Sequence, residues 1–197
     1  MQKRLLLILI PLCALLTVAH AKNGYQKGYL VTLENDTLYG EIKDRRPGTF
    51  TEIYDRIRFK KDGALFRKKY APEEIKSYKA GDRLYESVGL ETRSRFLKTT
   101  YLTGPAHEKV FLRVIEKGTL TYYQWEYIDY DNNTVWYIPL FHKENSSEMV
   151  RVTQGLFGLK KKVLSTYLSD CPSLQQKMES KEVTTPLEVL NYYKRCE

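Results

Sequence analysis

Residues 109–140, KVFLRVIEKGTLTYYQWEYIDYDNNTVWYIPL, decide the fold of this chain. β-Branched and aromatic residues dominate three runs, 109–116, 120–127 and 134–140, and the pattern alternates along each run as in a strand. Turn residues separate the runs, first Lys117-Gly118 and then 129–133. Connections this short allow only antiparallel pairing. The stretch therefore predicts a three-stranded meander.

The same signals extend the sheet in both directions. The sequence predicts a hairpin from 29–33 and 37–42, and a second from 57–59 and 64–66 around the turn Lys61-Asp62-Gly63. A helical turn is expected at 71–75, then an extended stretch at 78–88 interrupted at Gly81-Asp82. We expect 91–105 to be a loop with one strand at 96–101, 141–147 to be a polar loop, and 148–153 to be a short strand.

The C-terminal segment changes to helical spacing. A helix is expected at about 160–168, a second after Pro172, and a third at Thr185-Pro186-Leu187-Glu188, which combines an N-cap threonine, an N1 proline and a capping-box glutamate. If the last two helices pack antiparallel, Cys171 and Cys196 become neighbours. The sequence predicts a structural disulfide between them.

These elements define the expected architecture. The fold class is α+β: mostly antiparallel β, as a twisted sheet or a partly open barrel, with a C-terminal helical hairpin. We expect an antiparallel β domain over 22–158 and a helical segment over 159–197 packed on the same domain.

Residues 1–21 resemble a cleavable export signal. Lys3 and Arg4 precede an apolar run that is too short to span a bilayer, and Ala19-His20-Ala21 fits a cleavage site after Ala21. We expect an exported protein, periplasmic, envelope-associated or extracellular, with no transmembrane segment after cleavage. Cleavage removes two cations and no acid, so the net charge of +8 falls by 2 to +6. Anionic glycan or lipid surfaces are the partners that this charge suggests outside the cytoplasm, whereas nucleic acid is disfavoured by compartment.

The chain lacks motifs that indicate chemistry. His107 and His142 stand at no metal-ligand spacing, and the calcium-like series Asp129, Asp131, Asn133 continues with Thr134 where an EF-hand loop needs glycine. No catalytic residue, metal ligand or cofactor is predicted. An enzyme with a site assembled only in space remains an alternative, and it would place a histidine beside a carboxylate in a pocket.

Aromatic residues are dense in the central strands. Alternation places Tyr123, Trp125 and Tyr127 on one face of their strand, and Trp136 follows on the next. These four residues are the candidate binding surface. Alternatively, one aromatic face is core and the rings of the other face only pack across strands on the sheet surface.

The order of several short blocks resembles a group of uncharacterised exported proteins of Bacteroidota. The blocks are Gly28-Tyr29-Leu30-Val31, Asp36-Thr37-Leu38-Tyr39-Gly40-Glu41-Ile42, Tyr70-Ala71-Pro72-Glu73-Glu74-Ile75, Asp170-Cys171-Pro172 and Asn191-Tyr192-Tyr193. The resemblance implies an envelope-associated module and no activity. We expect a non-enzymatic interaction or adaptor module that contacts an envelope protein. The alternative is a polysaccharide- or lipid-headgroup-binding protein using an aromatic and basic sheet face.

Overall fold

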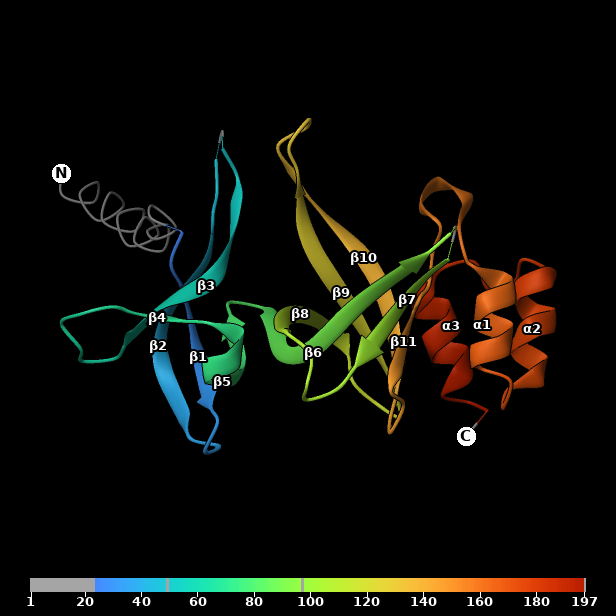
Figure 1. Cartoon of the computed structure of the whole chain (residues 1–197), viewed down its shortest axis with the longest axis horizontal. Helices are drawn as coiled ribbons and strands as arrows, with labels where there is room; N and C mark the ends of the chain where they lie inside the picture. Colours follow the sequence, from blue (N-terminus) through green and yellow to red (C-terminus); the bar gives the residue numbers. More distant parts are fainter. Residues whose placement is uncertain (1–23, 49, 97, 197) are drawn as a thin grey trace, which may run out of the picture.

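The computed structural model describes residues 24–48, 50–96 and 98–196 (Figure 1). The expected export signal, residues 1–21, lies outside the described residues. Along the long axis of the molecule, an open sheet is followed by a barrel and then by a group of helices.

The open sheet, which we call the first lobe, contains the strands β1 to β5. They are β1 (Gln26–Thr32), β2 (Thr37–Arg46), β3 (Glu52–Lys61), β4 (Lys68–Tyr70) and β5 (Ile75–Ala80), and the short helix η2 (Pro72–Glu74) precedes β5. Their order is β4-β3-β2-β1-β5, and all pairs are antiparallel. One face of this sheet packs into a core cluster that includes Leu30, Ile42, Ile57, Phe59 and Tyr78.

The barrel contains the other six strands of the described residues. They are β6 (Arg83–Arg95), β7 (Lys98–Thr103), β8 (Lys109–Glu116), β9 (Leu120–Asp129), β10 (Thr134–Lys143) and β11 (Glu148–Arg151). Their order is β6-β7-β11-β10-β9-β8. The last strand of this order, β8, also pairs with residues 84–89 of the first, β6, and this pairing closes the ring. Closure removes the exposed edges that an open sheet would leave. The interior is filled by a cluster that includes Leu90, Tyr101, Leu112, Tyr123 and Leu140.

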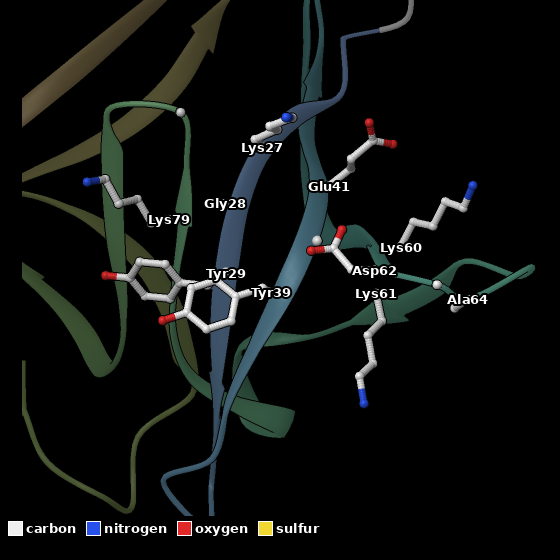
Figure 2. Close-up of a pocket in the computed structure, with 13 residues that line it drawn as sticks. Lys27, Gly28, Tyr29, Tyr39, Glu41, Lys60, Lys61, Asp62, Ala64 and Lys79 are labelled. Atoms are coloured by element: carbon white, nitrogen blue, oxygen red, sulfur yellow. The ribbon is translucent and has the colours of Figure 1, made fainter.

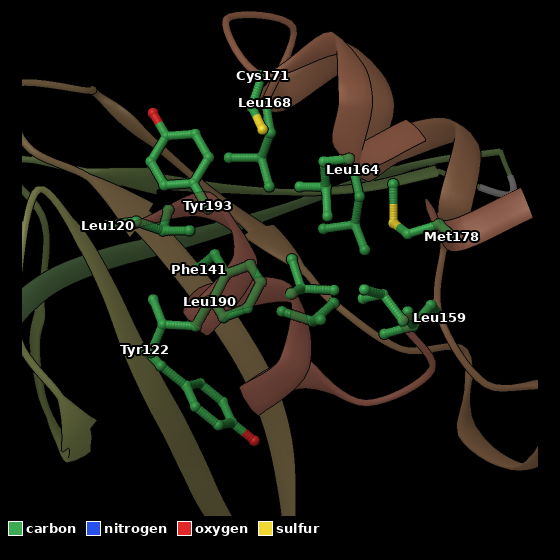
Figure 3. Close-up of a cluster of buried hydrophobic side chains, with 14 residues drawn as sticks. Leu120, Tyr122, Phe141, Leu159, Leu164, Leu168, Cys171, Met178, Leu190 and Tyr193 are labelled. Atoms are coloured by element: carbon green, nitrogen blue, oxygen red, sulfur yellow. The ribbon is translucent and has the colours of Figure 1, made fainter. Parts of the chain in front are cut away.

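Helices cover one side of the barrel. After η3 (Gly155–Phe157) come α1 (Lys161–Tyr167), α2 (Pro172–Glu179) and α3 (Pro186–Tyr193). Figure 3 shows Leu164, Met178 and Leu190 of these helices in one cluster with Tyr122 and Phe141, which lie on the outer face of the barrel.

The features predicted to hold the helices are confirmed. Cys171 and Cys196 form a disulfide with a Cα–Cα distance of 5.7 Å. At the start of α3 the Thr185 hydroxyl accepts a hydrogen bond from the Glu188 amide at 3.3 Å, and the Glu188 carboxylate accepts one from the Thr185 amide at 3.0 Å. These bonds satisfy two of the backbone donors that a helix start leaves unpaired.

The predicted α+β class is confirmed. The barrel and the twisted sheet, expected as alternatives, occur together because β6 belongs to both: its first residues pair with β5, and residues 84–89 pair with β8. The expected 22–158 β region includes both the first lobe and the barrel, and the helical segment packs against the barrel.

Three local predictions were wrong. The return strand of the second hairpin is β4, not 64–66, because Tyr70 is the residue whose ring packs on Phe59, at 6.1 Å between centroids. Within the expected loop at 91–105, the strand expected at 96–101 corresponds to β7, but β6 also continues to Arg95 and forms a hairpin with it, whose far end is exposed and so lacks apolar alternation. The loop expected from 141 begins later, because β10 continues to Lys143 and buries Phe141 against the helices.

Candidate interaction surfaces

The four predicted surface residues share one face, and that face turns into the barrel. The register pairs Leu140 with Tyr123 and Trp136 with Tyr127. Tyr123 is buried, and its hydroxyl donates to the Glu86 carboxylate at 2.7 Å. Trp125 packs edge-on against Tyr101 at 6.5 Å between ring centroids. Tyr123 is therefore interior, and Trp125 packs against the barrel core.

Tyr127 and Trp136 remain accessible because the β9–β10 hairpin extends beyond the ring. β8 pairs with β9 only up to Gln124, so the hairpin from there to its turn is a two-stranded ribbon, as Figure 1 shows. On this ribbon Tyr127 is 45% exposed and Trp136 is 49% exposed. The indole nitrogen of Trp136 donates to the neighbouring Thr134 hydroxyl at 3.0 Å. We call the ribbon, residues 125–138, the aromatic hairpin.

Further exposed rings lie elsewhere on the aromatic hairpin. Tyr137 lies opposite Glu126 and so on the other face, where it is 49% exposed. Tyr130 sits in the turn and is 87% exposed. Neither residue is among the four of the predicted binding surface. Rings on both faces and at the turn form a projecting element with no single flat platform.

The charged side chains of this region are all acidic. Residues 120–141 contain three acids, Glu126, Asp129 and Asp131, and neither lysine nor arginine. Asp129 accepts hydrogen bonds from the Asp131 amide at 3.1 Å and from the Asn132 side chain at 2.7 Å, and these bonds shape the turn. The aromatic hairpin is therefore acidic as well as apolar.

Two contacts brace the hairpin against the first lobe. At the tip, the Asn133 side chain accepts a hydrogen bond from the Thr51 amide at 2.9 Å and donates to the Gly48 carbonyl at 3.3 Å. Nearer the barrel, the Glu126 carboxylate binds the Arg45 guanidinium at 2.8 Å and the Tyr85 hydroxyl at 2.7 Å. The hairpin is thus fixed in position relative to the lobe.

The second brace is part of a buried ionic cluster. Asp44, with a side chain 3% exposed, accepts hydrogen bonds from Arg45 at 3.2 and 3.0 Å and from Arg83 at 3.1 and 3.2 Å. Burial alone would lower the pKa of Arg45, but the carboxylates of Asp44 and Glu126 raise it above its ordinary value. Burial, reinforced by Glu126, raises the pKa of Tyr85. The arginines stay charged and Tyr85 stays a neutral donor, so the cluster is a structural joint.

A surface hollow of about 760 Å³ lies on the first lobe (Figure 2). Tyr29 and Tyr39 meet there edge to face, at 6.0 Å between ring centroids. Lysines surround them, with Lys79 on one side and Lys60 and Lys61 on the other. Glu41 and Asp62 are the acids of its lining, so the rim carries more positive than negative charge.

One of the two histidines has the carboxylate neighbour that the enzyme alternative expects. His107 Nδ1 lies 3.2 Å from the Glu91 carboxylate, and His142 Nε2 lies 2.8 Å from the Ser146 carbonyl. Neither lines the hollow of Figure 2. Across residues 24–48, 50–96 and 98–196, no group of three or more His, Cys, Asp or Glu side chains could hold a metal ion.

Comparisons with known proteins add no family. No family model, no curated protein and no solved structure matches this chain. Within the described residues, no helix has the length and apolar character needed to cross a bilayer.

Proposed function

We propose that this protein is an exported, non-enzymatic interaction module of the cell envelope, and that the aromatic hairpin is the surface that binds a partner protein. The observation that carries the proposal is the hairpin itself. Tyr127, Trp136, Tyr137 and Tyr130 leave large apolar rings in water on a rigidly braced projection. Tyrosine and tryptophan are the residues that most often supply binding energy at protein interfaces.

The placement of the rings favours a protein over a glycan. Tyr127 and Trp136 lie side by side on one face of the ribbon, but Tyr137 lies on the opposite face and Tyr130 in the turn, so a sugar stacked on one face would leave exposed rings uncovered. A protein groove can enclose a ribbon from both sides and contact all of these rings. The acidic turn with Asp129 and Asp131 further favours a groove with basic residues at its rim.

Export is the other half of the proposal. The N-terminal sequence, the resemblance to exported proteins and the joined cysteines support it, since disulfides persist in oxidising compartments. Fractionation of cells that produce the chain, with mass spectrometry of its N-terminus, tests it. We expect an envelope-fraction protein that begins at Lys22. Recovery of the intact N-terminus in the cytoplasm would contradict the proposal.

Site-specific photo-crosslinking tests the binding surface. A photoreactive phenylalanine is placed at Trp136 or Tyr137, and at the 85% exposed Phe157 in η3 as the matched control. We expect both hairpin positions to give one adduct with the same protein, which the control does not give. Trp136→Ala and Tyr127→Ala should abolish co-purification of that protein. The same adducts at Phe157, or no adduct at the hairpin, would refute the assignment.

A further inference from the structure

The loop between β3 and β4 exposes two adjacent bulky apolar side chains. Leu65 is 87% exposed and Phe66 is 85% exposed, and neither belongs to a core cluster of the described residues. Burying either side chain against an apolar phase is favourable by about 1.5–3 kcal/mol, so exposing two together on a short loop is costly unless something covers them.

The apolar pair stands within a concentration of positive charge. Residues 56–69, RIRFKKDGALFRKK, contain seven cations, Arg56, Arg58, Lys60, Lys61, Arg67, Lys68 and Lys69, and one acid, Asp62. Of these cations, Arg56 has an ion-pair partner in Glu74 at 3.0 Å. We call residues 60–69 the basic loop. Its tip is apolar, and its two stems are cationic and exposed.

The adjacent sheet face continues the positive charge. Lys43, Arg58 and Lys69 are register partners across β2, β3 and β4, so they form one row on the face opposite to the core. Lys27 and Lys60 flank Glu41 in the next row of the same face. The hollow of Figure 2, with Lys60, Lys61 and Lys79 on its rim, adjoins the base of the basic loop.

A smaller hollow of about 290 Å³ adds a place for an anion. Lys43, Arg46, Arg58 and Arg67 line it together with Tyr25, and no acid does. The Tyr25 ring lies under the Arg67 guanidinium at 4.6 Å. The Tyr25 hydroxyl is buried and has no hydrogen-bond partner among the described residues. Arg46 is paired with Glu52 at 3.0 Å, so the hydroxyl would serve an oxyanion attracted mainly by Lys43, Arg58 and Arg67.

We propose that the first lobe docks on an anionic lipid bilayer through the basic loop. Leu65 and Phe66 enter the interfacial region, and the surrounding lysines and arginines face the headgroup phosphates. An apolar tip with a cationic collar combines the two terms that hold peripheral proteins on membranes, burial of apolar area and attraction to anionic lipid.

Vesicle co-sedimentation tests the proposal without any other protein present. The chain is used from Lys22 onward, which keeps every described residue and removes an apolar leader that could itself bind lipid. We expect binding to vesicles of phosphatidylglycerol and phosphatidylcholine that weakens as salt rises, and little binding to phosphatidylcholine alone. Equal binding to both vesicles, or no binding to either, would overturn the proposal.

Paired variants separate the two contributions. Each exposed cation is worth about fivefold in affinity for an anionic surface, so Arg67→Gln with Lys69→Gln should weaken binding about 25-fold. The matched control, Lys161→Gln with Lys162→Gln on α1, removes the same charge and should change binding less than about threefold. Leu65→Ser with Phe66→Ser should weaken binding at least about tenfold while leaving the circular dichroism spectrum unchanged. Equal losses from the basic-loop and control pairs would refute docking at this loop.

Two further experiments test membrane insertion and binding of a free anion separately. In a Phe66→Trp variant, lipids brominated on their acyl chains should quench the additional tryptophan fluorescence. Absence of quenching would mean surface adsorption only and would overturn insertion.

If millimolar inorganic phosphate displaces the protein from vesicles at constant ionic strength, the ligand is a free oxyanion in the smaller hollow, and the bilayer assignment fails.

Discussion

Replacing Asp44 with alanine tests whether the buried ionic cluster holds the first lobe to the barrel. The change removes the acceptor of four hydrogen bonds from Arg45 and Arg83. Removing one partner of a buried pair costs about 3–5 kcal/mol because it leaves charge without compensation. The arginine side chains are 17% and 16% exposed and so reach some water. We therefore expect a loss at the lower end, about 3 kcal/mol.

Urea unfolding followed by circular dichroism measures this loss. With an m-value of about 2 kcal/mol/M, the midpoint should fall by about 1.5 M. Asp55→Ala is the control, because Asp55 is an exposed carboxylate on β3, and it should shift the midpoint by less than about 0.3 M. A shift of less than about 0.5 M for Asp44→Ala would show that the cluster is solvated, and the reasoning would fail.

A double substitution identifies the cause of the loss. Asp44→Leu with Arg83→Met removes a charge pair together and keeps apolar volume, so it should recover part of the stability that Asp44→Ala loses. If the double variant is no more stable than the single one, lost packing explains the result better than uncompensated charge.

Three further results are expected. Cys171→Ser with Cys196→Ser should lower the free energy of unfolding by about 3 kcal/mol, since the bridge closes a loop with a sequence separation of 25, and a midpoint unchanged by the substitution would contradict this. Burial would raise the pKa of Asp170, but the hydrogen bond from Lys143 at 2.7 Å holds it below its ordinary value. The Asp170 carboxylate therefore contributes stability that is present above its unfolded pKa and is lost as pH falls through its lower folded pKa. Asp170→Asn should flatten the decrease in the free energy of unfolding below about pH 4. An unchanged pH profile of stability would refute this. Thr185→Ala should cost about 1 kcal/mol through loss of the N-cap, whereas Thr184→Ala, beside it, should cost less, and equal losses would count against the capping role.

Local sequence patterns predicted the features that local interactions determine. The strands around Gly118 and the turn 129–133 follow from alternation and turn residues, and the third helix follows from Thr185, Pro186 and Glu188. The disulfide was predicted because antiparallel packing of the last two expected helices brings Cys171 next to Cys196. The strand, turn and helix signals each lie within a few residues of the element that they specify, so a single sequence contains them.

Long-range features could not be predicted in the same way. Alternation places Tyr123 and Tyr127 on one face, but it does not say that the face turns inward, because closure depends on pairing between β6 and β8. Arg45 stands in the sequence as a surface cation beside Arg46, yet its partner Glu126 is 81 residues away. The exposure of Leu65 was missed because an apolar residue after a turn also fits a return strand.

The shared strand β6 limits how this chain can change in length. Tyr85 packs into the core of the first lobe, and Leu90, at the opposite parity along the strand, packs into the barrel. An inserted or deleted residue between them would turn one of the two side chains to the wrong face, because each single-residue step reverses the face. We therefore expect insertions to be confined to loops such as the one that contains Leu65, while β6 keeps a fixed number of residues.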